Sequence, residues 1–420
     1  MKKIILAILL FGLTSGMAFA EEIVKVTMDQ AVQIAIEKNI TYQAKKKDLE
    51  IAAKNIDIAN ALKNPQLFAH TLMGRVTRSN NSQLGMNVPV EILKRSARKG
   101  VAIAEYQKAK TELEQYEYNL RIDVMNAYLD VLCAKSYYAL MERKERWYKA
   151  VLLVAETKKN PEPRYEVNML RAKTKHEREL MELNYLKSNV NSAICNLNKV
   201  MNTNEWTISY DTIEDSFQEN KEMMQINLPS LDELEKIALK HNFELRVSKD
   251  DINIAGKNIT LAKRQRVPDL YLAGGYAYQK LTVHDPYNGA YVTAGLDLPI
   301  FYTYRPEIEK AKITLDRLKC DRVGYEDILR YIIQDNYNKF HAHKKNMECA
   351  RKIYGDMDKI LIMESRAYER NEIRLMDLMG IEDSQQRYMT EFINCIHQYY
   401  KAYLELLRNL GKDIGDDNNL

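Results

Sequence analysis

The chain has 420 residues, of which 46% are hydrophobic and 29% are charged, and its formal net charge is +4. A balance this close to neutral argues against nucleic acid as a partner, because nucleic-acid-binding proteins carry a strong excess of basic residues. After residue 20 no stretch approaches 18 consecutive apolar residues, so the sequence predicts no transmembrane helix.

Residues 1–20 have the pattern of a secretory signal peptide. Lys2 and Lys3 form a basic start, an apolar run over residues 4–13 follows, and small residues lead to a cleavage site at Ala20. No cysteine follows this site, so we expect no lipid anchor there. We therefore expect an exported chain that is either soluble or spans a membrane as a barrel.

The first elements after the signal peptide are a helix and a β-hairpin. Residues 28–59 carry small or apolar side chains at steps of three and four, a heptad pattern that predicts a helix packed closely against others. Asn64 and Pro65 end this pattern. Two strand candidates follow on either side of a polar turn, and we expect a β-hairpin over residues 66–90.

A nearly unbroken helical pattern then runs from residue 97 to about residue 158. Such a helix would measure roughly 90 Å, which no globular core covers, so the pattern predicts an elongated helical structure. A tip near residues 160–164 contains Pro161 and Pro163, and a second helix over residues 165–201 completes an antiparallel helical hairpin. Residues 202–228 lose periodicity, and we interpret them as an inter-repeat segment.

The second half of the chain repeats the first. Its heptad pattern over residues 231–262 matches the earlier one with a shift of 203, and Pro268 follows Pro65 by the same shift. A second β-hairpin is predicted over residues 269–300, with strands of about 10 residues, the length of tilted membrane-spanning strands. Seven of the 27 tyrosines lie between Tyr271 and Tyr304. An aromatic belt at a membrane interface would explain them, and so would a hairpin packed on a soluble core.

A long helix over residues 306–368, a tip near residues 369–372 and a helix over residues 372–410 complete the second repeat. The predicted division is a signal peptide (1–20), a first repeat (21–201), the inter-repeat segment (202–228), a second repeat (229–411) and a flexible tail (412–420). The predicted fold class is mostly α with a small β part: long antiparallel helical hairpins and two β-hairpins. Four strands cannot close a barrel, whereas three chains with four strands each give twelve.

The sequence lacks the patterns of an enzyme. It contains no HExxH, GxSxG or P-loop motif, and the closest pair among its seven histidines, His341 and His343, falls on different helix faces. We expect no catalytic activity, no metal site and no other cofactor. The five cysteines are widely spaced, and small buried core positions fit them better than a disulfide framework, with a single bridge left open.

This arrangement resembles the TolC-type outer-membrane efflux family over essentially the whole mature chain. The segments that carry the resemblance are residues 64–67, 88–90, 126–129, 267–270, 298–300 and 368–378. The resemblance implies a homotrimer with a shared twelve-stranded β-barrel in the outer membrane and a helical tunnel (an α-barrel) in the periplasm. It also implies that the tunnel meets a periplasmic adaptor (membrane fusion) protein and an inner-membrane pump, so that the chain is a passive, gated exit duct for efflux or secretion.

The resemblance further assigns roles to residues at the helical tips. The family has a glycine at each tip and an acidic residue six positions on, which here are Asn160 with Glu166 and Asn371 with Asp377. Asparagine tolerates the left-handed conformation that glycine supplies. The proline pair in the first tip departs from the family pattern, and Gly380 stands where a second acidic residue often lies.

The gate candidates at the periplasmic end are Asp377, Glu166, Arg374, Arg370 and Tyr368, and the adaptor-docking candidates are Asn160, Arg164, Asn371 and Glu372. A ring of three Asp377 side chains would bind cations and hold the pore shut through contacts with Arg374 or Arg370. The alternative interpretation of Asp377 is a solvated residue in the first turn of a helix, where the helix dipole favours an acid.

The alternative function is a periplasmic coiled-coil adaptor or another non-channel helical interaction protein. Such a protein shares the signal peptide and the helical hairpins, but it does not need alternating β-hairpins at matching places in a repeat. A secreted helical hydrolase is a more distant rival, because no catalytic constellation is present. Drugs, metal ions, polypeptides and polysaccharides all leave through ducts of this kind, and the sequence favours none of these cargoes.

Overall fold

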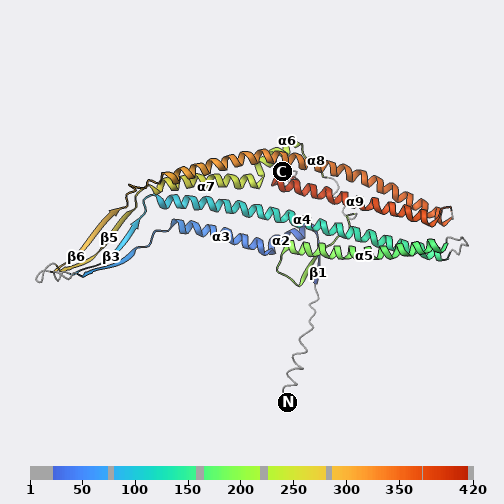
Figure 1. Ribbon diagram of the computed structural model, residues 1–420, viewed down its shortest axis with the longest axis horizontal. Coiled ribbons are helices and arrows are strands. Elements are labelled where there is room, and N and C mark those ends of the chain that lie inside the picture. The colour runs from blue at the N-terminus through green and yellow to red at the C-terminus, as the bar shows by residue number, and fades with distance from the viewer. Residues whose placement is uncertain are drawn as a thin grey trace, which may run out of the picture. The chain divides into compact units, whose positions relative to one another are not determined.

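The computed structural model describes residues 22–73, 80–157, 165–217, 226–280, 286–370 and 372–414. Its helices are α2 (Met28–Lys38), α3 (Ile40–Asn60), α4 (Lys94–Thr157), α5 (Tyr165–Met201), α6 (Leu231–His241), α7 (Phe243–Gln265), α8 (Arg305–Glu369) and α9 (Leu375–Leu410) (Figure 1). Its strands are β1 (Glu22–Val26), β2 (Gln66–Met73), β3 (Asn80–Val90), β4 (Ile208–Thr212), β5 (Leu270–Lys280) and β6 (Pro286–Leu296). The predicted class, mostly helical with a small β part, is confirmed. Within the described ranges no helix is apolar over a stretch long enough to cross a bilayer.

The chain gathers into two compact units, and each unit takes residues from both sequence repeats. The first unit comprises residues up to 43, residues 116–240 and residues from 330 onward, and the second comprises residues 44–115 and 241–329. The longest helices, α4 with 64 residues and α8 with 65, contribute to both units. The sequence repeats are therefore not the units of packing.

The heptad pattern over residues 28–59 forms two helices and not one. The chain breaks at Asn39, whose Oδ1 accepts a hydrogen bond from the Tyr42 amide at 2.8 Å and whose Nδ2 donates to the Met201 carbonyl at 2.9 Å. At the matching position of the second repeat, Asn242 begins α7 and accepts from the Leu245 amide at 3.1 Å. A one-residue cap hardly disturbs a seven-residue period, so the pattern alone conceals both breaks.

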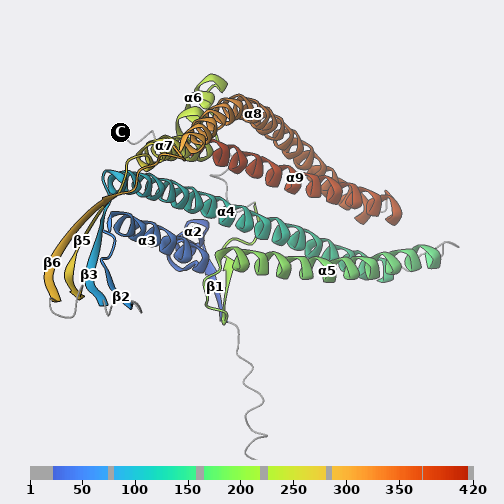
Figure 2. The same ribbon diagram turned by 60° about the vertical axis from the view of Figure 1, so that its left-hand side comes forward.

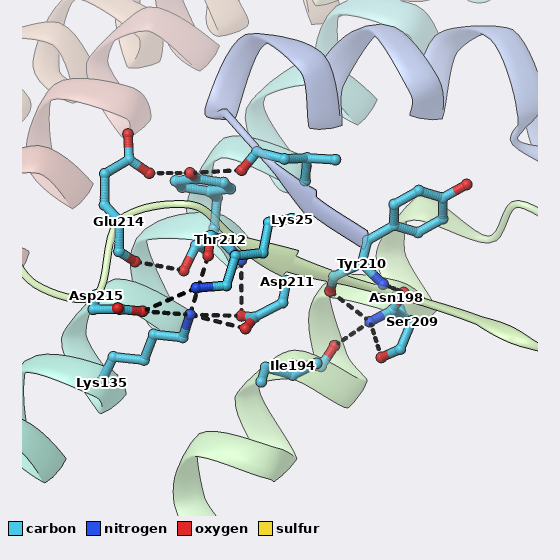
Figure 3. Close-up of polar contacts among 12 residues, drawn as sticks. Lys25, Lys135, Ile194, Asn198, Ser209, Tyr210, Asp211, Thr212, Glu214 and Asp215 are labelled. Atoms are coloured by element: carbon cyan, nitrogen blue, oxygen red, sulfur yellow. Dashed lines mark hydrogen bonds and ion pairs between the residues drawn. The ribbon is translucent and has the colours of Figure 1, made fainter. Parts of the chain in front are cut away.

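The first unit contains a two-stranded parallel sheet that holds the inter-repeat segment. β1 and β4 pair in register from Glu22↔Ile208 to Val26↔Thr212. Lys135 of α4 lies beneath β4, where its ammonium group pairs with Asp211 at 2.8 Å and donates to the Thr212 carbonyl at 3.1 Å (Figure 3). Nothing in the sequence predicted this sheet, because its strands are short and far apart along the chain.

Asn198 of α5 fixes the other side of β4. Its side-chain amide accepts from the Tyr210 amide at 2.8 Å and donates to the Tyr210 carbonyl at 3.0 Å, so it takes the place of a neighbouring strand at that residue (Figure 3). Tyr128 of α4 donates to the Val26 carbonyl at 3.0 Å and also contacts Glu214. Both long helices of the first hairpin therefore bind the small sheet through buried or part-buried side chains.

The core of the first unit follows one stripe of α9. The buried residues of this helix are Leu378, Met379, Glu382, Gln385, Met389, Phe392, Ile393, Ile396, Tyr399, Tyr400, Leu404, Leu406, Leu407 and Leu410. Aromatic rings fill much of the space beside the stripe, and Phe340 of α8 packs on Tyr399 with ring centroids 5.0 Å apart. The spacing of the stripe follows the 3.6-residue period of a helix with one buried face.

The second unit contains a four-stranded antiparallel sheet with the order β2-β3-β5-β6 (Figure 2). The two predicted hairpins are joined by the β3–β5 pair, which runs from Asn80↔Lys280 to Val90↔Leu270. The alternating pattern extends to Ile300, but β6 ends at Leu296. Pro299 has no amide hydrogen and cannot donate to a strand ladder, which accounts for the earlier end.

Helices α4 and α7 pack together in this unit through polar side chains. Thr111 donates to Asp250 at 2.6 Å, and Lys108 pairs with Asp251 at 2.7 Å. Where the strands meet the helices, Lys94 pairs with Asp269 at 2.9 Å, and both side chains are largely buried. This last pair fixes the start of α4 to the residue that precedes β5.

The cysteines are all free thiols. Cys133 is buried as expected, but Cys195, Cys320 and Cys349 are exposed, so the expectation of core positions was wrong for these three. The helical pattern located them on helices and could not tell which face of the chain they occupy. The predicted signal peptide lies outside the described residues. Asp413, at the start of the expected flexible tail, pairs with Arg121 of α4 at 2.8 Å.

Candidate functional site

The four-stranded sheet has two chemically different faces. Residues in one register row, Leu67↔Met86↔Gly274↔Val292, alternate with those of the adjacent row, Gln66↔Asn87↔Ala273↔Thr293. The large exposed side chains on the first face are Leu67, Leu84, Met86, Val88, Val90, Leu272, Tyr276, Tyr278, Val292 and Leu296. Val292 is 85% exposed. A contiguous apolar face of this kind indicates contact with a membrane or another protein.

The second face carries glycines beneath aromatic rings. Phe68, Gly85, Gly275 and Tyr291 form one register row across all four strands. A Cβ at Gly85 would overlap the Tyr291 hydroxyl and the tip of the Phe68 ring, so rings from the two edge strands converge over the central strands. These glycines are required for close approach.

Gly275→Val is expected to disrupt the pairing of β3 and β5. A Cβ at Gly275 would overlap the backbone of Leu84 and Gly85, and backbone cannot move aside as a flexible side chain can. We expect the backbone amides of β3 and β5 to lose most of their protection against hydrogen exchange. Gly295→Val is the matched control, because nothing lies within 4 Å of a Cβ there. Equal protection in the two variants would contradict the close-approach role of Gly275.

The gate candidates of the second hairpin form two local ion pairs. Arg374 is the N-cap of α9, and its guanidinium pairs with Asp377 at 3.1 Å, with both side chains largely exposed. Arg370 pairs with Glu372 at 3.4 Å. Exposed pairs this close in sequence contribute about 0.3–0.5 kcal/mol each. In a single chain the arrangement therefore fits a solvated first-turn acid with its own arginine.

The remaining tip candidates are not brought together with these pairs. Tyr368 is half-buried near the end of α8, and Glu166 is an exposed residue in the first turn of α5. Among the described residues, Arg370 and Arg374 pair with Glu372 and Asp377 and not with Glu166. Asn160, Arg164 and Asn371 lie outside the described residues.

A partly buried charged cluster, which the sequence did not reveal, joins the two helical hairpins. We call Lys144, Lys175, Glu179, Glu382 and Asp383 the interhelix cluster. Lys144 of α4 is 5% exposed and pairs with Glu179 of α5 at 3.0 Å and with Asp383 of α9 at 3.5 Å. Lys175 of α5 also pairs with Asp383. Charged residues are common on long helices, and only the packing of three helices shows that Lys144, Glu179 and Glu382 are buried.

Tyr148 and two glutamines complete the surroundings of the cluster. The Tyr148 hydroxyl donates to Asp383 at 3.2 Å, and the Lys144 and Lys175 ammonium groups lie 5.6 Å and 5.4 Å from its ring centroid. Gln386 accepts from Lys144, and Gln385 donates to Asp358 of α8 at 3.3 Å. Burial raises the pKa of Tyr148, which keeps its hydroxyl protonated as a donor.

Neither a protein-family model nor a curated protein matches the chain. Solved structures do match it, over nearly its full length. A membrane protein from Pseudomonas aeruginosa aligns over 94% of this chain and 92% of its own, with 15% identity and a TM-score of 0.75. CusC, whose structures concern folding and transmembrane channel formation, aligns over 96% of each chain with 13% identity and a TM-score of 0.74.

The outer-membrane channel MtrE of Neisseria gonorrhoeae, in its open state, aligns over 91% of this chain and 88% of its own, with 14% identity and a TM-score of 0.72. The chain has the outer-membrane channel fold. The resemblance drawn from the sequence is thus confirmed at the level of the fold. Within this fold, the helical hairpins and the small antiparallel sheet are the parts that the sequence repeat predicted.

Proposed function

We propose that the chain is one subunit of a homotrimeric outer-membrane channel. The observation that carries the proposal is the four-stranded sheet with one exposed apolar face and two open edges, in a chain with the outer-membrane channel fold. In lipid every backbone amide and carbonyl must be paired, so an open edge has to be joined to another strand. The apolar face would then contact lipid, and the polar face would line the passage.

The strand order allows three copies to close such a sheet. β2 and β6 are the edges, and because each neighbouring pair is antiparallel, β2 and β6 run in opposite directions. β6 of one copy can therefore continue the antiparallel order with β2 of the next. Three copies supply twelve strands, which is within the range of outer-membrane barrels.

The long helices then form a tunnel through the periplasm, and the channel acts as the exit duct of a tripartite efflux or secretion system. A periplasmic adaptor and an inner-membrane pump are the partners, with Asn160, Arg164, Asn371 and Glu372 as docking positions. The duct performs no chemistry. The fold shared with CusC and MtrE supports the channel, and the partners and docking positions rest on the resemblance to the family.

Membrane fractionation followed by gel electrophoresis without heating tests the proposal. We expect a trimer in the detergent-soluble outer-membrane fraction, and discrete single-channel currents when it is added to planar bilayers. A monomeric protein that salt alone releases from the periplasmic fraction would overturn the channel and support the adaptor interpretation.

Asp377→Ala is expected to raise single-channel conductance and to weaken block by divalent cations. Three Asp377 side chains at a narrow opening would concentrate cations, and removing them removes that binding site. Glu391→Ala is a control, because Glu391 is also an exposed acid on α9, about four turns further along. Unchanged conductance and cation block would assign Asp377 to the solvated helix start.

A further inference from the structure

Glu382 is a buried carboxyl group at the meeting point of three helices. It belongs to the buried stripe of α9 and is 4% exposed, in a stripe that is otherwise almost entirely apolar or aromatic. Its Oε2 atom accepts no hydrogen bond from any described residue. A buried carboxylate in this position costs free energy unless it is paired or protonated.

The charges of the interhelix cluster do not leave a partner for Glu382. Its two lysines, Lys144 and Lys175, are each in contact with Asp383, and Lys144 also pairs with Glu179. Two ammonium groups balance the two carboxylates of Glu179 and Asp383. Ionised Glu382 would therefore place a surplus negative charge among the helices, whereas protonated Glu382 leaves the cluster neutral.

The groups that face Glu382 come from each helix packed against it. α4 contributes Lys144 and Tyr148, α5 contributes Lys175 and Glu179, and α9 itself contributes Asp383. On the α8 side, Asp358 is engaged by Gln385, three residues along α9. His176 of α5 pairs with Glu145 of α4 at 3.1 Å, so it is a further polar contact between α4 and α5.

We propose that Glu382 is a proton-sensitive latch, which holds α9 against α4 and α5 when protonated and weakens that packing when ionised. Opening lets water reach the carboxylate and removes the cost of the surplus charge. If the proposed channel is correct, the latch joins the two helical hairpins of the tunnel, so loss of the proton favours their separation. That functional consequence rests on the proposed function, whereas the latch itself rests on the cluster.

The direction of the pH effect follows from burial. Burial is the largest influence on Glu382, and repulsion by Asp383 and Glu179 adds to it, so that its pKa is raised from 4.5 to about 7 despite the two lysines. The packed state therefore binds more protons than the open state between about pH 4.5 and pH 7. Packing is strongest at the acidic end of this window and weakens as the pH rises through it.

Hydrogen exchange in the purified full-length protein tests the latch. Exchange of the α9 amides around Glu382 is measured at pH 5.5 and pH 8.5 and divided by the intrinsic rate at each pH. We expect the wild-type protein to lose protection on the order of thirtyfold between the two values, from a pKa of about 7 when packed and 4.5 when open. In Glu382→Gln, whose side chain is neutral at every pH and similar in shape, we expect most of this loss to disappear.

Two comparisons separate the effect of the Glu382 carboxyl group from the effects of other charged side chains. Glu391→Gln removes an exposed acid from the same helix and should keep the wild-type response. His176→Gln removes the imidazole that contacts Glu145, and the difference between wild type and Glu382→Gln should persist in that background. Equal pH responses in wild type and Glu382→Gln would overturn the latch, as would an equal flattening by Glu391→Gln.

The exchange measurement does not require conduction, so failure of the latch and failure of the channel give different results. An absent latch gives equal pH responses in wild type and Glu382→Gln, whatever the conductance. An absent channel gives no single-channel current, and the exchange difference between the two proteins remains. Where both hold, the open probability rises between pH 5.5 and pH 8.5 in wild type and stays nearly constant in Glu382→Gln.

Discussion

Val292→Lys is expected to abolish most of the assembled trimer in the outer membrane. Val292 lies on the apolar face of β6 and is 85% exposed, so in the proposed barrel it points toward lipid. A lysine at the middle of the lipid face destabilises a barrel by about 2–4 kcal/mol, and a trimer would carry one such lysine in each of its three subunits. The measurement is the amount of heat-dissociable trimer in isolated outer membranes, compared with wild type at equal expression.

Thr293→Lys is the matched control, one position along the same strand. Thr293 shares a register row with Gln66, Asn87 and Ala273, and that row lies on the polar face of the sheet. A lysine there would extend into a water-filled passage and should leave the trimer intact. If both variants assembled equally well, the apolar face would not contact lipid, and the two-sided reading of the sheet would be wrong.

Lys144→Met is expected to be the most destabilising single change in the helical part of the chain. Lys144 is 5% exposed and contacts carboxylates on both α5 and α9, so its loss leaves buried negative charge without a partner. Breaking a buried ion pair in this way costs about 3–5 kcal/mol. In a hydrogen-exchange measurement, the protection of the α5 and α9 amides beside the cluster should fall by roughly one hundredfold to a few thousandfold.

Two further variants separate pairing from a general effect of losing a lysine. Lys359→Met removes an exposed ion pair with Asp356, and we expect a loss of less than about 1 kcal/mol. Lys144→Met combined with Glu179→Met replaces both members of the Lys144–Glu179 pair by apolar groups and should recover much of the lost protection. A single Lys144→Met variant as stable as wild type would show that the cluster is hydrated and not a buried network.

Much of the secondary structure could be predicted from the sequence because it depends on local periodicity. The long helices follow from sustained helical patterns, and the strands follow from alternation bounded by turns. The breaks at Asn39 and Asn242 were missed, although each asparagine has a side chain suited to capping a helix. The sequence did contain a signal for these breaks, namely an asparagine at the same position in both repeats. Its capping role becomes clear only from the hydrogen bonds that the two side chains accept from the Tyr42 and Leu245 amides.

The parts that could not be predicted depend on contacts between distant segments. β1 and β4 are five-residue strands whose pairing requires Lys135 and Asn198 from two different helices. The interhelix cluster likewise consists of lysines and acids that are ordinary on helix surfaces. Their burial follows from three helices meeting, and no spacing within one helix signals it. The roles of the tip residues come from the resemblance to the family, and they stay predictions.

The interleaving of the two compact units affects how the chain must mature. The first unit needs residues near the beginning, the middle and the end of the polypeptide, since β1 pairs with β4 and α9 supplies the core stripe. The first unit can therefore not finish folding before the end of the chain is available to it, whereas the second unit needs no residue beyond 329. The earlier segments of the first unit have to be kept from aggregating until α9 arrives, which predicts a dependence on holding chaperones during biogenesis.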